Sequence, residues 1–163
     1  MTSPSSTNIT AWGYYLPEKI LTNADLETMV ETTDEWIVTR TGMRERHIAQ
    51  PNQFASHLGI AAVENLIARN QVSVDDVDTI IATTFTPDHF APAVSALIQG
   101  HFKMKDAATF DLGAGCTGFA YALHVADALI TCGKSKKLLI VAAESISKIV
   151  DYEDRATCIL FGD

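Results

Sequence analysis

Residues 108–119 are Ala-Thr-Phe-Asp-Leu-Gly-Ala-Gly-Cys-Thr-Gly-Phe, and this segment is the most informative about the fold. Its first five residues predict a short strand, and the three glycines that follow predict a tight turn. A helix that is apolar nearly all round comes next, over residues 117–132, and we expect it to lie deep in the protein. A strand that turns directly into a helix is the repeating unit of an α/β fold.

The same rhythm of strands and helices extends to both sides of this turn. Apolar runs without polar alternation predict further strands, and apolar residues at helical spacing predict helices. The elements expected here are strands over residues 78–84, 137–143 and 157–161 and helices over residues 54–70 and 93–102. Buried strands that alternate with helices indicate a mostly parallel sheet covered on both faces.

The first third of the chain predicts smaller elements. The Ser- and Thr-rich residues 1–8 are expected to be a disordered lead. The elements that follow are a strand over residues 9–16, short helices over 26–30 and 34–39, and an extended segment over 43–49. Capping residues precede both helices, and Gly42 predicts the end of the second.

The glycine cluster supports two interpretations. Gly113, Gly115 and Gly118 form the spacing Gly-x-Gly-x-x-Gly between a strand and a helix, which is typical of dinucleotide-binding loops. That pattern expects an acidic residue about 20 positions later. Lysines lie near that distance, and the acidic candidate Glu144 comes 144 − 118 = 26 residues after the last glycine. The spacing therefore weakens the nucleotide interpretation, which stays an alternative.

The second interpretation concerns Cys116, which lies inside the same turn. Backbone amides and the positive end of a helix favour a thiolate over a thiol. A thiolate is the reactive nucleophile of cysteine near neutral pH. We therefore favour Cys116 as a catalytic nucleophile. Cys132 and Cys158 are expected to be buried as small hydrophobic side chains.

The composition excludes several classes of protein. The chain has 163 residues with 12 basic and 20 acidic side chains, and its net charge of −8 argues against nucleic-acid binding. No apolar run approaches the roughly 20 residues of a membrane helix. The first residues lack the pattern of a secretory signal, so we expect a cytoplasmic protein. The three cysteines lack zinc-ligand spacing, and we expect no metal site.

Four stretches carry a family resemblance. They are Thr-Asn-Ala-Asp-Leu-Glu (22–27), Thr-Asp-Glu-Trp-Ile-Val-Thr-Arg-Thr-Gly-Met-Arg-Glu-Arg-His-Ile-Ala (33–49), Asp-Leu-Gly-Ala-Gly-Cys-Thr-Gly-Phe (111–119) and Asp-Arg-Ala-Thr-Cys-Ile-Leu-Phe-Gly-Asp (154–163). In content and order, the chain resembles the N-terminal half of β-ketoacyl-acyl-carrier-protein synthase III, a thiolase-fold condensing enzyme. The resemblance implies that residues 9–163 form the N-terminal half of a five-layered αβαβα arrangement with a mostly parallel, mixed sheet.

The resemblance also implies an activity. In that family the cysteine matching Cys116 takes an acyl group from acetyl-coenzyme A or another short acyl-coenzyme A. The acyl-enzyme then condenses with malonyl-acyl-carrier protein as carbon dioxide leaves, which initiates fatty-acid synthesis. No cofactor is implied besides the coenzyme A thioester, which is a substrate. The family usually has Ala-Ala-Cys where this chain has Ala114-Gly115-Cys116, a change that keeps the nucleophile and that we expect to loosen the turn slightly.

The coenzyme A site is implied by four matching residues. Trp36 and Arg155 match the pair that sandwiches the adenine, and Thr32 and Arg40 match residues at its adenine and phosphate end. Without the resemblance, Trp36 would be a core residue beside a solvated Arg40, and Thr32 a helix cap. Phe90 lies near the family phenylalanine that lines the partner's acyl pocket across a homodimer, although a core or loop role is equally compatible with its surroundings.

The family's decarboxylation residues, a histidine and an asparagine, belong to the second half of its chain. The five histidines here lie outside any motif of that role. We therefore expect the C-terminal half to be a separate or missing segment. Three alternatives stay open: a related condensing enzyme of a secondary-metabolite pathway, a nucleotide-binding module, and a non-catalytic structural half-domain.

Overall fold

The computed structural model describes residues 7–163, which divide between two compact units. The sheet unit comprises residues 1–15 and 55–144, and the hairpin unit comprises residues 16–54 and 145–163. Of the expected disordered lead, residues 1–6 lie outside the described residues. Each unit is described by itself below.

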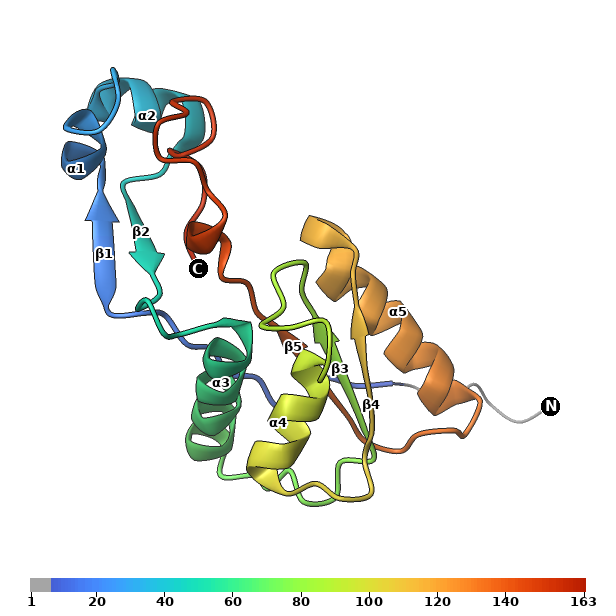
Figure 1. Cartoon of the computed structure of the whole chain (residues 1–163). Helices are drawn as coiled ribbons and strands as arrows, with labels where there is room; N and C mark the ends of the chain where they lie inside the picture. Colours follow the sequence, from blue (N-terminus) through green and yellow to red (C-terminus); the bar gives the residue numbers. More distant parts are fainter. Residues whose placement is uncertain (1–6) are drawn as a thin grey trace. The chain divides into compact units, whose positions relative to one another are not determined.

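The sheet unit is built around three parallel strands (Figure 1). The central strand β3 (Thr79–Thr83) pairs on one side with β4 (Ala108–Leu112) and on the other with β5 (Leu138–Ala142). Every residue of β3 is buried, as a continuous apolar run predicts. The predicted parallel sheet and these three strand positions are confirmed.

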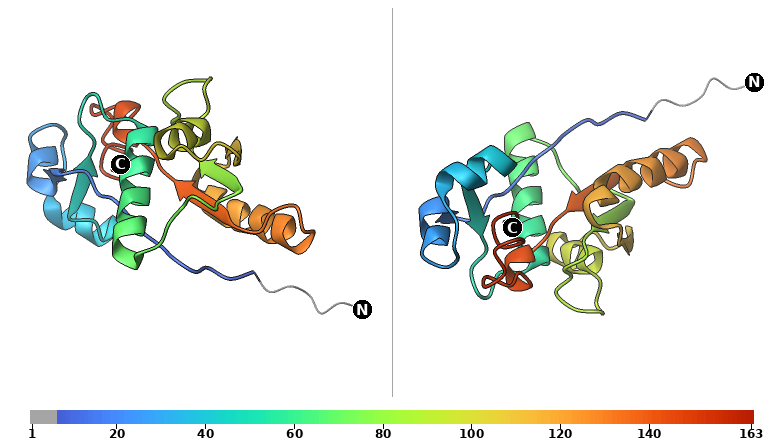
Figure 2. Two further views of the ribbon diagram at one scale, coloured as in Figure 1. Left: turned by 90° about the horizontal axis from the view of Figure 1, so that it is seen from below. Right: turned by 90° about the horizontal axis from the view of Figure 1, so that it is seen from above.

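Helices cover both faces of this sheet (Figures 1 and 2). They are α3 (Ala55–Asn70), α4 (Val94–Phe102) and α5 (Gly118–Thr131). Gly59 of α3 lies so close to the sheet that a Cβ there would come 2.9 Å from Val141 Cγ1 and 3.2 Å from Ile98 Cδ1 of α4. On the other face, Ile81 packs against Ala122 and Ala126 of α5.

The prediction that α5 lies deep in the protein is wrong. The helix forms as expected, but only Gly118, Ala122 and Ala126 are buried. Phe119 and Tyr121 are 47% and 54% exposed. One stripe of small residues is enough for close packing on the sheet, and the larger apolar side chains point away from it. The apolar composition predicted the helix but not which sides of it are covered.

Asp78 ties the start of β3 to the segment before β5. Its carboxylate accepts hydrogen bonds from the Ser135 hydroxyl, from the Lys136 amide at 2.7 Å and from the Thr79 hydroxyl at 3.1 Å. Desolvation alone would raise the pKa of Asp78, but these hydrogen bonds outweigh it and lower the pKa.

The hairpin unit contains two antiparallel strands and two short helices. Strand β1 (Lys19–Thr22) pairs with β2 (Glu45–Ile48), and α1 (Asn23–Glu27) and α2 (Asp34–Thr41) lie between them in the chain. The first helix begins three residues earlier than expected because Thr22 forms a capping box with Asp25. Gly42, with φ of 75°, ends α2 as predicted. Two 3₁₀ turns complete the elements, η1 (Gly115–Thr117) in the sheet unit and η2 (Ile146–Lys148) in the hairpin unit.

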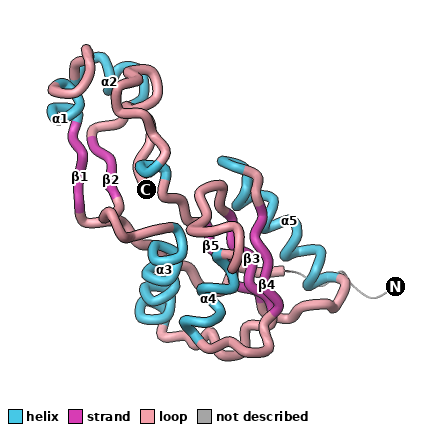
Figure 3. Tube along the Cα trace, in the orientation of Figure 1, coloured by secondary structure: helices cyan, strands magenta, loops and turns pink. Residues whose placement is uncertain are grey.

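Two predicted strands are absent. Residues 9–16 do not join a sheet. Side chains of α3 bind their backbone instead: Tyr14 N donates to Asn65 Oδ1 at 3.2 Å, and Asn70 Nδ2 donates to the Trp12 carbonyl at 2.9 Å. Residues 157–161 lie in successive turns (Figure 3), in which Cys158 N donates to the Asp154 carbonyl at 3.0 Å.

The turn at residues 157–161 nevertheless contributes to the core of the hairpin unit. That core consists of six buried residues: Leu21, Leu26, Ile37, Ile48, Cys158 and Ile159. The apolar run was therefore correctly expected to be buried, although its backbone conformation was not.

None of the helices in the described part of the chain combines the length and the apolar character that crossing a bilayer requires.

Candidate active site

Cys116 lies on the turn that joins β4 to α5, as the sequence predicts. Gly115, the residue before it, has φ of 52°, in the left-handed region that glycine adopts without strain. The turn η1 then leads directly into the helix. Cys116 itself is exposed. The geometry therefore presents a thiol to solvent at the N-terminal end of α5.

The glycines of this turn have structural roles of their own. A Cβ at Gly118 would lie 2.9 Å from Thr83 Oγ1, so α5 can begin against the end of β3 only with glycine there. The amide of Thr117 donates to the Ala114 carbonyl at 3.2 Å, and the amide of Gly118 donates to the Gly115 carbonyl. These two donors are engaged within the turn, which weakens the phosphate-loop interpretation.

The three cysteines differ in accessibility. Cys158 is buried, as expected, and burial raises the pKa of its thiol, with a further contribution from the charge of Asp154. Cys132 is exposed, so the expectation that it is buried is wrong. It is the C-cap residue of α5, where the helix end leaves it accessible.

Phe90 lies on the loop between β3 and α4 and is fully exposed. Glu144 holds the start of this loop, accepting hydrogen bonds from the amides of Phe85 at 3.0 Å and Thr86 at 3.1 Å. The Thr84 hydroxyl also donates to Glu144, at 3.0 Å. Glu144 was the acidic candidate of the dinucleotide-binding pattern, and the structure shows instead that it binds this loop.

Two further carboxylates hold the rest of the loop. Asp88 accepts from the Ser56 amide at 2.8 Å and from its hydroxyl at 2.6 Å, at the start of α3. Asp111 accepts from the amides of Val94 at 2.8 Å and Ser95 at 2.9 Å, at the start of α4. Sequence reasoning missed both, although Asp111, as a lone carboxylate inside a predicted strand, carried a signal of such a role. Phe90 is thus presented from a loop that is anchored along its length.

The predicted coenzyme A residues belong to the hairpin unit, and three of them lie together. The Arg155 guanidinium carbon is 4.5 Å from the centre of the Trp36 ring, and that of Arg40 is 5.7 Å from it. Trp36 is half-buried against the core of the unit. The ring is therefore fixed from behind and flanked by two cations, a cation–π arrangement.

Thr32 is not a helix cap, which is the role that it would have without the family resemblance. The cap of α2 is Thr33, whose hydroxyl accepts from the Trp36 amide at 3.1 Å. The Thr32 hydroxyl oxygen is buried and has no hydrogen-bond partner among the described residues. A buried hydroxyl without a partner is costly and uncommon in a folded protein.

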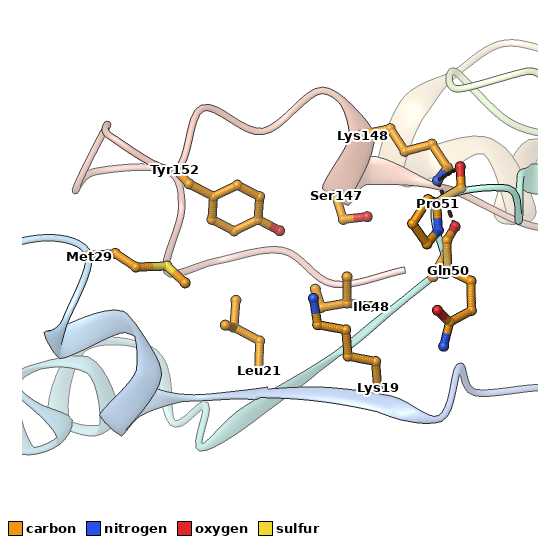
Figure 4. Close-up of a pocket in the computed structure, with 10 residues that line it drawn as sticks. Lys19, Leu21, Met29, Ile48, Gln50, Pro51, Ser147, Lys148 and Tyr152 are labelled. Carbon is orange, nitrogen blue, oxygen red and sulfur yellow. Dashed lines mark hydrogen bonds between the residues drawn. The ribbon is translucent and has the colours of Figure 1, made fainter.

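The hairpin unit also contains a cavity of about 590 Å³, which is not lined by the predicted coenzyme A residues (Figure 4). Its lining is a mixture of aliphatic, aromatic and basic side chains: Lys19, Leu21, Met29, Ile48, Ala49, Gln50, Pro51, Ser147, Lys148 and Tyr152. Lys148 is engaged there, donating to the carbonyls of Gln50 at 2.9 Å and Pro51 at 3.2 Å. No predicted site residue lines this cavity.

Known proteins resemble the chain in both sequence and fold. The family described as 3-oxoacyl-[acyl-carrier-protein (ACP)] synthase III matches residues 110–163. The chain is 55% identical over 159 residues to β-ketoacyl-[acyl-carrier-protein] synthase III 2 of Halalkalibacterium halodurans, which covers 98% of this chain and 48% of that relative. The chain spans about half the length of the relatives it matches.

Solved structures resemble the fold closely. β-Ketoacyl-[acyl carrier protein] synthase III from Thermus thermophilus has a TM-score of 0.93 at 48% identity, covering 96% of this chain and 49% of that one. The priming β-ketosynthase of the R1128 polyketide biosynthetic pathway has a TM-score of 0.89 at 34% identity, covering 94% of this chain and 46% of that one. The thiolase-like fold expected from the sequence is confirmed.

Proposed function

Because this chain belongs to the β-ketoacyl-[acyl-carrier-protein] synthase III family and corresponds to its N-terminal half, we propose that it supplies the acyl-accepting cysteine of an enzyme that initiates fatty-acid synthesis. Residues 9–163 would act as the N-terminal half-domain of that acyltransferase. The observation that carries the proposal is the exposed Cys116, held on a left-handed glycine turn at the start of α5.

The first step is acyl transfer. The Cys116 thiolate attacks the thioester carbonyl carbon of a short acyl-coenzyme A, and a tetrahedral oxyanion forms. The Cys116 amide is proposed to donate a hydrogen bond to that oxyanion. Collapse of the intermediate expels coenzyme A as a thiolate, which takes a proton from water, and leaves the acyl group as a thioester on Cys116.

The second step is condensation with malonyl-acyl-carrier protein. Loss of carbon dioxide from the malonyl group gives an enolate, whose carbon attacks the acyl carbon and releases the Cys116 thiolate. The histidine and asparagine that would stabilise the enolate are proposed to come from the C-terminal half of the family's chain. That half is also proposed to cover the outward side of α5, where Phe119 and Tyr121 are exposed.

Coenzyme A is proposed to bind at Trp36, with Arg155 closing over the adenine and Thr32 and Arg40 at its adenine and phosphate end. A base between the Trp36 ring and the Arg155 guanidinium needs two contacts of about 3.5 Å, or about 7 Å between the outer planes. The present separation is 4.5 Å. Binding therefore requires Arg155, which is exposed, to move outward by about 2.5 Å.

Phe90 supports a proposed homodimer. A fully exposed phenylalanine on an anchored loop presents apolar surface that a partner can cover. We propose that Phe90 reaches the acyl pocket of a second copy, as the family resemblance implies. A cytoplasmic location stays a prediction.

The relatives help to weigh the alternatives. Identity to the synthase III of Halalkalibacterium halodurans is 55%, against 34% for the polyketide priming enzyme, which favours the fatty-acid function over a secondary-metabolite one. The nucleotide-binding and purely structural alternatives predict that Cys116 does not accept an acyl group.

The test is mass spectrometry of the full chain after incubation with acetyl-coenzyme A. We expect one acetyl group per chain, absent from Cys116→Ser and retained in Cys132→Ser. Cys132 is the matched control because it is also exposed. An adduct that persists in Cys116→Ser would overturn the proposal. Tight binding of NAD without any adduct would instead favour the nucleotide-binding loop.

A further inference from the structure

Arg46 is a buried arginine in the middle of the hairpin unit, with only 3% of its surface exposed. It lies on the segment that the sequence predicts to be extended, residues 43–49, two positions after the exposed Arg44. On β2, however, Arg46 alternates inward with the buried Ile48, whereas Glu45 faces out. The charge of Arg46 is therefore directed into the protein and not toward solvent.

The contacts of Arg46 are neutral acceptors. Its Nε donates to the Ile159 carbonyl at 3.0 Å, one terminal nitrogen donates to the same carbonyl, and the other donates to Asn23 Oδ1 at 2.5 Å. The ion pairs found among the described residues do not include Arg46. Desolvation lowers the pKa of its guanidinium, so burial works against the charged form. An apolar side chain would fill this position at lower cost, which points to a role beyond packing.

Arg46 connects two segments that are distant in the chain. Asn23 is also buried, and its side chain links Arg46 to α2. Its Nδ2 donates to Asp34 Oδ1 at 2.7 Å and to the Met43 carbonyl at 3.0 Å. Asp34 is the first residue of α2, two residues before Trp36. On the other side, Ile159 lies four residues after Arg155 in the same run of turns. Arg46 thus binds the backbone of Ile159 directly and reaches the start of α2 through the side chains of Asn23 and Asp34.

We propose that Arg46 is a positioning residue for the adenine clamp formed by Trp36 and Arg155. This inference rests on the proposed function. Arg46 fixes the spacing between α2 and the turns at residues 151–160, so that the clamp opens by rotation of the Arg155 side chain alone. Without Arg46, the two backbones separate and the clamp loses the spacing that a stacked base requires.

The first test reads this geometry without any ligand. The chain has two tryptophans, so Trp12→Phe leaves Trp36 as the only one. In that background, Arg155→Met removes the cation over the ring and changes Trp36 fluorescence. Arg46→Met is expected to reproduce that change, whereas Arg44→Met, on the exposed side, leaves the emission unaltered. If Arg46→Met has the emission of its parent, the inference is wrong.

The second test measures coenzyme A binding to the full chain by titration calorimetry. Arg46→Met is expected to weaken binding at least about fivefold, the lower end of what one stacked base contributes. The rate of Cys116 alkylation by iodoacetamide is expected to stay unchanged, which a general loss of folding would alter. Should Arg46→Met not fold, Asn23→Ala breaks only the connection to α2 and is expected to give the same loss of affinity.

The outcomes separate this inference from the function on which it rests. A parent chain that does not bind coenzyme A overturns both. A parent that binds coenzyme A, with an affinity that Trp36→Ala weakens and that neither Arg46→Met nor Asn23→Ala changes, overturns only the positioning role.

Discussion

The conformation of Gly115 determines how firmly the turn presents Cys116, and Gly115→Ala measures it. The new methyl group would meet nothing within 4 Å, so its cost comes only from the backbone φ of 52°. An L-residue in this region costs roughly 1–2 kcal/mol. Replacing glycine recovers about 0.4–1 kcal/mol by restricting the unfolded chain. The net expectation is destabilisation of up to about 1.6 kcal/mol.

Gly100→Ala is the matched control. Gly100 lies in α4, is exposed, and would also meet nothing within 4 Å, but its φ is not in the left-handed region. Alanine there is expected to stabilise the protein by about 0.4–1 kcal/mol. The difference between the two variants, about 1–2 kcal/mol, therefore isolates the cost of the left-handed turn.

Urea unfolding followed by tryptophan fluorescence gives both free energies of unfolding. The substitution at Gly115 also creates the Ala-Ala-Cys order usual in the family, so a relaxed turn is a real competing outcome. If Gly115→Ala stabilises the protein as much as Gly100→Ala, the turn does not hold a left-handed residue. The argument that Gly115 shapes the presentation of Cys116 would then be refuted.

Two more predictions concern titrating groups. Asp78→Asn is expected to destabilise the fold by about 1–3 kcal/mol at pH 7. Because the pKa of Asp78 is lowered in the folded protein, the difference in stability between the two proteins should persist above the unfolded pKa of about 3.9 and vanish as the pH falls through the folded pKa. Urea unfolding at several pH values would measure this difference. Cys158, buried and with a raised pKa, should react with a thiol reagent only after unfolding, whereas Cys116 and Cys132 react in the native protein; three fast thiols would contradict its burial.

Local sequence patterns predicted the three strands of the parallel sheet and the longer helices. Strands 79–83, 108–112 and 138–142 and helices 55–70 and 118–131 form close to their expected bounds. The position of Cys116 on the turn between strand and helix also followed from the local signals. The signals that predicted them come from residues near one another in the chain, where periodicity and turn chemistry are informative.

The errors share a different physical cause. Residues 9–16 and 157–161 have the composition of strands, but strand formation requires a partner that composition does not identify. Side chains of α3 bind the backbone of the first segment, and turn hydrogen bonds from Asp154 occupy that of the second. Likewise, the apolar sides of α5 indicate a tendency to be buried but not the surface that would bury them.

Arg46 shows that a sequence signal can exist and still be missed. Side chains on a strand alternate between two faces, so any interpretation that directs Ile48 of β2 inward must direct Arg46 inward as well. Arg44 shares this alternation with Arg46 but lies before β2 begins at Glu45, and it is exposed. A charged residue on the same face as apolar neighbours must find internal acceptors, and it finds them in two distant segments. Within the strand, alternation therefore distinguishes the buried Arg46 from a surface charge such as Glu45.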